Sequence, residues 1–559
     1  MRVNHRPSLF YREPRSVVPL VLIITPLALS AFTHLWNPIG FPFFHGDEAH
    51  YLRRAMHVLQ GLGPQEAKTE FERPFDHPYF GQLFLGGVFW AIGYPHFINL
   101  SITSFDGLKS IVEQLYLYPR VLMGILAILD TFLIYKITQR RYSRNAAFIA
   151  AVLFAVMPLT WLTRRVVLES IYLPFMLSSI LCALYLSHHR LVSASNNSKI
   201  KRFDNIRPIS RYLSRTRILT FTSGLLLGLA IFTKITAIMI IPLLLYLIFM
   251  KTDSNRLKTL RIWILPVIII PMIWPAYALI SGQLQDWIDG VLWQGDRDGR
   301  GLYRSFLTIF DMDPLLCIIG LTSIILVSAI KRDLFFLLWL VPFLLFYSLI
   351  PFIQHFHWIF ILPLLCIATG VCVSDLLDMI NKRKSVARAA IYSAVSALFI
   401  FGLISTILLI NINLNESLFM AQALIIKLLP YTDLKGQETA ENVILMGSNW
   451  MQSFSWIPEY VFNKGHSFKS YLEKNLPIEN ENTKKILLLV DRKDQEGFSL
   501  TDQEGRSLEK ERLYNNTHAI AEISEKSEYY KKLRDQYPYT SVHENRGIER
   551  GKIILKANY

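Results

Sequence analysis

Long apolar runs recur along most of this 559-residue chain and constrain its fold more than any other feature. A helix that crosses a bilayer needs about 20 mostly apolar residues. The chain is 52% hydrophobic and 18% charged, whereas soluble domains average about 25% charged residues. We therefore predict an α-helical multispanning membrane protein with eleven transmembrane helices, over residues 17–36, 121–137, 146–161, 166–187, 218–233, 235–250, 262–280, 315–330, 334–353, 358–373 and 389–410.

The distribution of basic residues predicts the orientation of these helices. Arg and Lys cluster in the N-terminal segment 1–16 and in the loops 136–144, 190–217, 251–261, 331–332 and 382–388. If all eleven runs cross the membrane, every one of these segments lies on the same side, and the positive-inside rule makes that side cytoplasmic. Cytoplasmic loops thus explain the net charge of +15, and no nucleic-acid-binding motif accompanies it. We expect a multi-pass protein of a prokaryotic cell membrane, without a nucleic-acid partner.

An odd number of spans places the remaining long segments on the non-cytoplasmic side. These segments are the loop 37–119, the loop 281–314 and the tail after residue 410. The apolar stretch YFGQLFLGGVFWAIGY, from Tyr79, would move basic loops outside if it crossed the membrane. We therefore predict that it forms a helix in the outer interface, with Trp90 and Tyr94 at that depth. A re-entrant segment is the alternative.

The composition changes sharply after the last apolar run, which divides the chain into a membrane domain, 17–411, and a tail, 412–559. The tail alternates short β-like runs, NVILMG and KILLLVD, with charged helical stretches such as DQEGRSLEKERLY. This alternation predicts a small soluble α/β domain at the C-terminus, on the non-cytoplasmic side.

Many ionisable residues from separate segments fall on the predicted outer side. Any one of them could simply extend its charged end to water, Lys234 could be a turn residue, and Arg165 could pair with Glu169 four positions later. Asp130 lies within a span, where a charge is costly, but toward the cytoplasmic half. The convergence of so many on one face favours an active site, built from Asp47, Glu48, His50, Arg53, Arg54, Asp76, His77, Arg120, Arg164, Arg165, Glu169, Lys234, Asp296, Arg297, Asp298, His355 and His357.

These residue types suit a substrate that is part lipid and part phosphate. The adjacent acids Asp47 and Glu48 offer a general base, and the Arg and Lys side chains offer phosphate ligands. A polyprenyl-phosphate sugar would keep its tail in the bilayer and present its phosphate to these cations. The base would deprotonate an acceptor hydroxyl while the lipid phosphate leaves, stabilised by fixed positive charge.

Several segments resemble a known enzyme family, in the family's order, over roughly residues 15 to 375. GDEAHYLRRA and FDHPYFGQLFLGGVFWAIGYP resemble the Asp-Glu and His-Pro-Pro motifs of the first outer loop of the protein O-mannosyltransferases and their relatives that transfer aminoarabinose to lipid A. YPRVLMGILAILDTFLIYKI, RRYSRNAAFIAAVLFAVMPLTWLTRRVVLESIYLPFMLSSI, GLLLGLAIFTKITAIMIIPLLLY and HFHWIFILPLLCIATG are similar to later helices of that family. The resemblance implies a GT-C integral membrane glycosyltransferase.

By this resemblance Asp47 is the general base with Glu48 beside it, and Arg120 meets the donor phosphate, assisted by Arg164, Arg165 and Lys234. The substrate-binding residues would be His77, Glu169, His355 and His357. Some relatives bind a divalent metal, for which Glu48, His77 and His355 are the candidates here, although no tight ligand spacing supports one. Tyr79 replaces the second proline of the His-Pro-Pro motif, and the β-trefoil insert of the eukaryotic enzymes is absent.

The implied reaction moves mannose or another hexose or pentose from a polyprenyl- or dolichyl-phosphate donor to a hydroxyl of a protein. An enzyme that extends a lipid-linked oligosaccharide or modifies a lipid is the alternative. A multispanning transporter would need ionisable residues near the midplane and inverted repeats, which the sequence does not clearly show. For Asp47, a second interpretation is a helix N-cap, in which its carboxylate accepts a backbone N–H.

Overall fold

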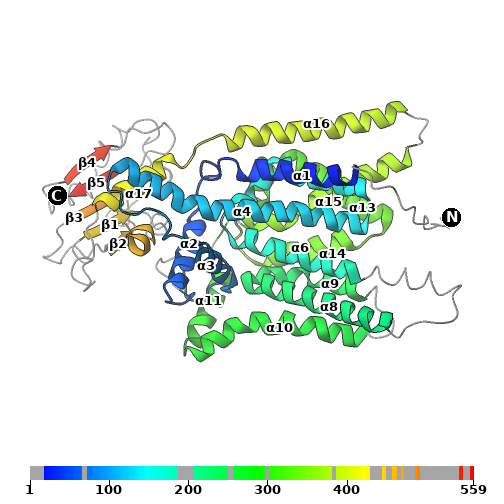
Figure 1. The fold of residues 1–559 in the computed structure, drawn as a ribbon, viewed down its shortest axis with the longest axis horizontal. Coiled ribbons are helices and arrows are strands. Elements are labelled where there is room, and N and C mark those ends of the chain that lie inside the picture. Colours follow the sequence, from blue (N-terminus) through cyan, green and yellow to red (C-terminus); the bar gives the residue numbers. More distant parts are fainter. Residues whose placement is uncertain are drawn as a thin grey trace.

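The computed structural model describes residues 18–65, 72–186, 207–249, 256–297, 299, 301–380, 385–428, 443–447, 456–462, 467–470, 485–490, 540–544 and 554–558. Long helices run side by side along one direction, and shorter helices and the strands gather at one end of them (Figure 1). This arrangement separates a lipid-facing bundle from a smaller group of elements at its end.

All eleven predicted apolar runs coincide with helix. Their helices are α1 (Val18–Leu35), α4 (Phe105–Arg141), α5 (Arg144–Val156) with η1 (Pro158–Arg164), α6 (Leu168–Leu186), α8 (Arg207–Thr233), η2 (Ile235–Ile240) with α9 (Ile241–Phe249), α10 (Arg256–Ile280), α13 (Pro314–Lys331), α14 (Phe335–Leu349), η3 (His355–Phe360) with α15 (Ile361–Met379), and α16 (Ser385–Ile410). The multispanning α-helical class is therefore confirmed.

Not every one of these helices is long enough to cross a bilayer by itself. Within the described residues, seven helices are sufficiently long and apolar, or eight if α5 and η1, which meet at 71°, form one span. The bend follows from Pro158, because the residue before a proline avoids the helical region, and Met157 is extended at φ −73° and ψ 140°. The other apolar helices are shorter, so the count of eleven spans remains a prediction.

The predicted outer loops contain four further helices: α2 (Gly46–Leu59), α3 (Phe80–Ile92), α11 (Leu284–Asp296) and α12 (Gly301–Met312). Helix α3 matches the helix predicted from Tyr79, and its Trp90 side chain is 78% exposed. Tyr94, predicted as a second interfacial anchor, is instead buried at 2% exposure. The expectation for Tyr94 was wrong because its hydroxyl has a partner inside the protein.

The partner of the Tyr94 hydroxyl lies in α4, which starts earlier than predicted. The helix begins at Phe105, where the hydroxyl of Ser104 accepts a hydrogen bond from Gly107 N at 3.3 Å, and it continues through Pro119. Proline has no N–H for the carbonyl four residues earlier. The Tyr94 hydroxyl donates to this carbonyl, Leu115 O, at 2.8 Å. Helix α4 therefore begins inside the predicted outer loop 37–119 and continues into the predicted span.

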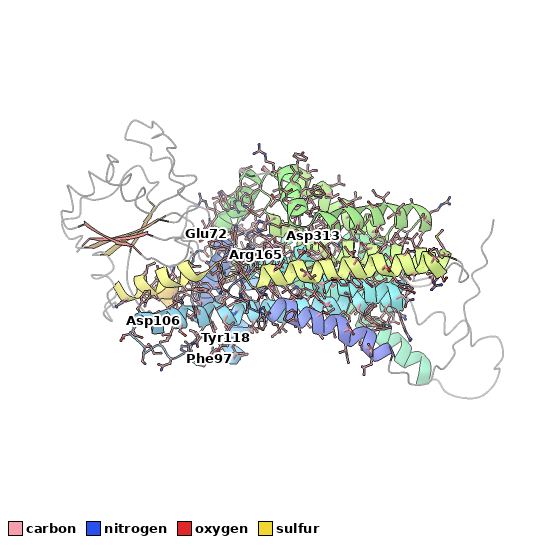
Figure 2. All side chains as sticks on the ribbon, turned by 90° about the horizontal axis from the view of Figure 1, so that it is seen from above. Glu72, Phe97, Asp106, Tyr118, Arg165 and Asp313 are labelled. Atoms are coloured by element: carbon pink, nitrogen blue, oxygen red, sulfur yellow. The ribbon has the colours of Figure 1, made fainter. Side chains whose placement is uncertain are left out.

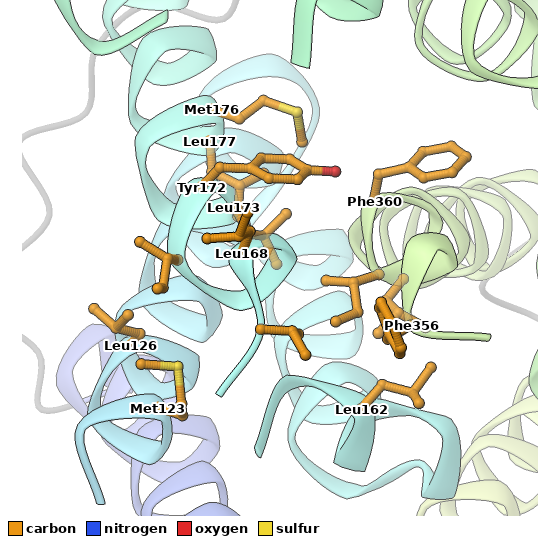
Figure 3. Packing of buried hydrophobic residues seen from close by; sticks show 14 of the residues in the cluster. Met123, Leu126, Leu162, Leu168, Tyr172, Leu173, Met176, Leu177, Phe356 and Phe360 are labelled. Atoms are coloured by element: carbon orange, nitrogen blue, oxygen red, sulfur yellow. The ribbon is translucent and has the colours of Figure 1, made fainter. Parts of the chain in front are cut away.

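Apolar side chains from several helices fill the interior of the bundle. Met123 and Leu126 of α4, Leu168 and Leu173 of α6, and Phe356 of η3 lie in this core (Figure 3). Helices α1 and α4 approach closely at Gly124, where an added Cβ would lie 2.8 Å from the His34 carbonyl oxygen. Small residues allow such close contacts between membrane helices.

The described part of the tail contains helix α17 (Glu416–Leu428), a short π-helical turn at Ile457–Val461 and five strands: β1 (Val443–Gly447), β2 (Ser467–Ser470), β3 (Lys485–Val490), β4 (Thr540–Glu544) and β5 (Ile554–Asn558). The strands form one sheet in the order β2-β1-β3-β5-β4. Strand β1 pairs in parallel with β2 and β3, whereas β5 pairs antiparallel with β3 and β4. Strands β1 and β3 coincide with NVILMG and KILLLVD. The helical stretch DQEGRSLEKERLY lies outside the described residues, so the complete α/β domain remains a prediction.

The Tyr94 hydroxyl should stabilise α4 only because Pro119 leaves a carbonyl without its helical donor. Tyr94→Phe should lower the unfolding free energy by about 1–3 kcal/mol, the cost of leaving a buried acceptor unsatisfied. The thermal midpoint of the purified protein in detergent would report this loss. In a Pro119→Ala background the alanine N–H can bond Leu115 O, so the same Tyr94→Phe change should cost much less. An equal cost in both backgrounds would contradict this account.

Candidate active site

Helix α2 presents the two predicted catalytic acids from its first turn. His45 caps this helix: its Nδ1 accepts from Asp47 N at 3.3 Å, and Glu48 Oε1 accepts from His45 N at 3.1 Å. Such reciprocal bonds fix the start of a helix. The N-cap interpretation of Asp47 is therefore wrong, because His45 occupies that position and the Asp47 carboxylate is left for other contacts.

Glu48 lies at the centre of a fully buried charge cluster. Arg120 donates to both of its oxygens, from Nε at 2.7 Å and from Nη2 at 2.9 Å. Arg165 Nη1 donates to Oε1 at 2.9 Å, and the backbone N–H of Val166 donates to Oε2 at 2.9 Å. Glu48 was predicted to act with Asp47 in catalysis, but the structure directs both of its oxygens to protein donors.

Arg120 is equally committed to the protein. Beyond Glu48 it donates to Pro38 O at 3.2 Å and Pro42 O at 3.3 Å, and its guanidinium lies 4.1 Å from the centre of the Phe44 ring. The side chain is 1% exposed. Arg120 therefore holds the segment before α2 against α4. Arg120 was predicted to bind the donor phosphate, and the contacts that the structure shows for it are these contacts with protein atoms.

Arg164 and Arg165 keep donors that the described residues do not use. Arg164 donates only through Nη2, to Trp36 O at 2.6 Å and Asn37 O at 2.9 Å, while its Nε and Nη1 are buried without a partner. Arg165 Nη1 also reaches Phe43 O at 2.7 Å, and its Nε has no partner. Buried N–H groups without partners are unfavourable unless a ligand or water satisfies them.

Asn415, which sequence reasoning missed, fastens the same segment from the far end of the chain. Its Nδ2 donates to Ile39 O, Gly40 O and Pro42 O at 2.7, 3.2 and 3.0 Å. Its Oδ1 accepts from Phe44 N at 2.9 Å. The residue lies immediately before α17, five positions after the end of α16, and is completely buried. Only its position after the last apolar run could have drawn attention to it.

Asp47 is the accessible acid of the site, with a side chain that is 38% exposed. Its nearest titratable neighbour is His45, whose Nδ1 lies 3.5 Å from Oδ1. Partial desolvation acts to raise the pKa of the Asp47 carboxyl, but His45, followed by Arg297 and His50, outweighs it and holds that pKa well below its usual range. Asp47 is therefore ionised at neutral pH. Arg297, named among the outer ionisable residues, contributes to this site through its charge.

A second buried ion pair joins α6 to the segment before η2. The Glu169 carboxylate contacts the Lys234 ammonium through Oε1, and His357 Nε2 lies 3.6 Å from the same oxygen. Lys234 is extended at φ −152° between α8 and η2, which lets its side chain turn toward α6. The alternative pairing of Arg165 with Glu169 does not form, because Arg165 points to Glu48 instead.

Tyr51, in the N-terminal half of α2, lies beside His77, which in turn contacts α11. Gln294 Nε2 of α11 lies 3.3 Å from His77 Nε2, and the rings of His77 and Tyr51 are 6.3 Å apart. Burial, opposed by Asp76 and assisted by Lys234, lowers the pKa of His77 to about 3, so this imidazole is neutral at pH 7. Burial, and then the charges of Asp47, Glu169 and Asp76, raise the pKa of Tyr51 well above its ordinary value. The charges of three carboxylates therefore act on one tyrosine.

The remaining acids and bases of the outer loop form structural pairs. Arg54 donates to Asp76 at 2.7 Å, and Glu72 contacts both His50, at 2.9 Å, and Arg53. Glu72 and Arg165 lie toward the end of the bundle that is nearer the sheet, whereas Asp313 lies farther along it (Figure 2). Glu72, Gln294 and Tyr51 escaped the sequence prediction because nothing in their local patterns marks them.

The candidate metal ligands do not come together as a site. Glu48 already accepts from two guanidiniums and two backbone N–H groups. His355 instead packs near the rings of His45 and Trp161, at 6.0 and 6.3 Å. Across the described ranges, no group of three His, Cys, Asp or Glu side chains is arranged to hold a metal ion. The predicted set of Glu48, His77 and His355 therefore does not fit a divalent metal. Asp130 lies apart from the site, buried in α4.

The two adjacent acids should differ sharply in their effect on stability. Glu48→Gln would leave Arg120 and Arg165 buried without a counter-charge, which typically costs about 3–5 kcal/mol. Asp47→Asn changes a partly exposed side chain and should leave the thermal midpoint within about 0.5 kcal/mol of the parent protein. Thermal unfolding of both purified variants in detergent would show this contrast. Similar midpoints for the two would remove Glu48 from its structural role.

Comparison with known proteins adds evidence at the level of the fold. No family model matches this sequence, and no curated protein sequence matches it. The crystal structure of ArnT from Cupriavidus metallidurans bound to undecaprenyl phosphate is similar, with a TM-score of 0.56 and 10% identity over 97% of this chain and 98% of that chain. The apo structure of the same protein gives 0.55 and 11% over the same shares. The Archaeoglobus fulgidus oligosaccharyltransferase gives 0.49 and 12% over 85% of this chain and 69% of that chain. The chain thus has the fold of ArnT, and the resemblance to GT-C membrane glycosyltransferases noted in the sequence is confirmed for the fold.

Proposed function

We propose that this chain is a membrane glycosyltransferase that moves a sugar from a polyprenyl-phosphate donor to an acceptor hydroxyl. One observation carries the proposal: an ionised, accessible carboxylate, Asp47, interacts with the buried guanidinium of Arg165, whose Nε has no partner. The fold shared with ArnT, whose crystal structure contains undecaprenyl phosphate, supports a lipid phosphate as the anion.

The charge balance of the site favours an anionic ligand. Arg120, Arg164 and Arg165 are all buried, and Glu48 pairs with two of them, Arg120 and Arg165. Arg164 contacts only carbonyl oxygens, so its charge is not neutralised by a described acid. A phosphate would satisfy the free donors of Arg164 and Arg165 with charge-assisted hydrogen bonds. Arg120 then acts mainly by holding Glu48 and the segment before α2, and Lys234 by holding Glu169.

The reaction follows from this placement. Asp47 removes the proton of an acceptor hydroxyl, the acceptor oxygen bonds to C1 of the sugar, and the bond between C1 and the phosphate oxygen breaks. The leaving lipid phosphate keeps the electron pair and is stabilised by the guanidiniums. A carboxylate with a very low pKa is a weak base. An anionic donor next to Asp47 raises that pKa, so the base becomes effective when the donor is bound.

The acceptor is proposed to be a hydroxyl of a protein on the non-cytoplasmic side, with a lipid-linked glycan or a lipid as the alternative. The donor cannot leave the bilayer, so its phosphate must meet Asp47 at the membrane surface. Substrate contacts near this carboxylate are assigned to His77, His355 and His357. The last two lie on η3, which packs against η1 and α6.

Asp47→Asn tests the catalytic step. The amide keeps the size of the side chain but cannot take a proton, so transfer from a radiolabelled polyprenyl-phosphate sugar should fall by roughly 10²–10⁴-fold. Binding of undecaprenyl phosphate should be retained, because the guanidiniums are unchanged. The comparison needs variants with equal thermal midpoints. Near-normal transfer by Asp47→Asn would exclude it as the base.

The proposed orientation can be checked with single cysteines in a background without the four native ones. Leu62 after α2 is 60% exposed, and Arg332 follows α13 toward the opposite end of the bundle. A membrane-impermeant thiol reagent should label Leu62→Cys in intact cells, because α2 belongs to the non-cytoplasmic loop. Arg332→Cys should label only after permeabilisation. The reverse pattern would invert the proposed topology.

A further inference from the structure

Three buried polar atoms without partners lie together just beyond the Glu169–Lys234 pair. They are Oε2 of Glu169, the hydroxyl of Tyr172 and the hydroxyl of Thr236. The Glu169 and Tyr172 side chains are completely buried and Thr236 is 5% exposed. Most buried polar atoms in folded proteins have a hydrogen-bond partner, so a cluster of three without one calls for a ligand or water.

These atoms converge from two different elements. Glu169 and Tyr172 are three residues apart on α6, which places them on the same face of the helix. Thr236 belongs to η2, and its hydroxyl interacts with those of Tyr172 and Tyr347, although it does not meet the geometry of a full hydrogen bond to either. Figure 3 shows the Tyr172 hydroxyl directed away from α6, toward the side on which Phe360 lies. Tyr347 of α14 adjoins the group, and its hydroxyl donates to His357 O at 3.3 Å.

The same group adjoins the catalytic carboxylate. Lys234 and His357 both contact Glu169, and the charges of Asp47 and Glu169 both act on the buried hydroxyl of Tyr51. A ligand held by Glu169, Tyr172 and Thr236 would therefore lie beside the carboxylate that is proposed to start the reaction. The phosphate-facing donors of Arg164 and Arg165 lie on the segment that leads into α6.

We propose that Glu169, Tyr172 and Thr236 form the recess that binds the hydroxyl groups of the donor's sugar, a proposal that rests on the function proposed above. A free carboxylate oxygen accepts from a sugar hydroxyl, and each protein hydroxyl can donate or accept. This combination matches a ligand that carries several adjacent hydroxyls. Leu168 and Phe356 belong to the apolar core that surrounds this region, and apolar side chains of this kind suit the apolar faces of a sugar ring.

The charges of the recess select the class of sugar. Lys234 neutralises Glu169, so the pair adds no net charge. A uronic acid would bring a carboxylate against the free Glu169 oxygen, which places like charges in a buried site and is costly. The recess is therefore assigned to a hexose or pentose without a carboxylate.

The test compares the purified full chain bound to undecaprenyl phosphate alone with the same chain bound to undecaprenyl phosphate that carries mannose, glucose or arabinose. The parent protein should bind at least one sugar-bearing lipid more tightly than the bare lipid. Tyr172→Phe and Thr236→Val should each weaken that sugar-bearing lipid by about two- to tenfold, the size of one neutral hydrogen bond. Their affinity for the bare lipid should not change. Tyr303→Phe, at a side chain that is 72% exposed, is the matched control.

Thermal unfolding without lipid separates binding from structure. Removing an unpartnered buried hydroxyl should leave the midpoint unchanged or raise it, so a lowered midpoint would show that the hydroxyls are structural and overturn the assignment. If the parent prefers a sugar-bearing lipid and both variants keep the whole preference, water alone fills the recess and the assignment fails while the proposed function stands. If the parent binds neither bare nor loaded lipid, the proposed function itself fails. Undecaprenyl phosphate that carries glucuronic acid is measured alongside, and tighter binding of that lipid would overturn the choice of a sugar without a carboxylate.

Discussion

The site depends on one buried carboxylate, Glu48, and the two guanidiniums that it holds. Removing three charges from water costs several kcal/mol for each ion, and only good geometry with further hydrogen bonds offsets that cost. Here Arg120 binds both oxygens, and Val166 and His45 add backbone donors. The cluster brings together α2, α4 and the segment before α6, which are separate in sequence. Asp47 takes its position from this cluster because it is the neighbouring residue in the first turn of α2.

Side chains of the same chemical type have different roles in this site. Of the two acids, Glu48 is buried and saturated with donors, whereas Asp47 is accessible and ionised. Of the three arginines, Arg120 donates all of its nitrogens to protein acceptors, whereas Arg164 and Arg165 keep N–H groups without a partner. Burial and hydrogen bonding, rather than residue type, therefore decide which groups support the fold and which remain for a ligand.

The sequence predicted the helices well, and it predicted that ionisable residues from separate segments gather at one end of the bundle. Both features depend on local patterns. Apolar length marks a span, and ionisable residues at its ends mark the side on which they gather. Contacts across the sequence were beyond such patterns. The pairing of Arg165 with Glu48 rather than Glu169, the capping role of His45 and the burial of Tyr94 depend on how helices meet. The early start of α4 at Phe105 was hidden by Pro119, whose cost is met by a tyrosine 25 residues before it in the chain.

The contact of Asn415 with the segment before α2 has a consequence for the synthesis of the protein and its insertion into the membrane. Asn415 is 376 residues from Ile39, whose carbonyl it binds, and contacts so distant in sequence form late because a long loop must first close. A ribosome completes residue 47 early and residue 415 only after the last apolar helix has been made. The nascent chain therefore carries the acid of its site through most of membrane insertion without the side chain that fastens it, and the site is assembled only when the helices are all present.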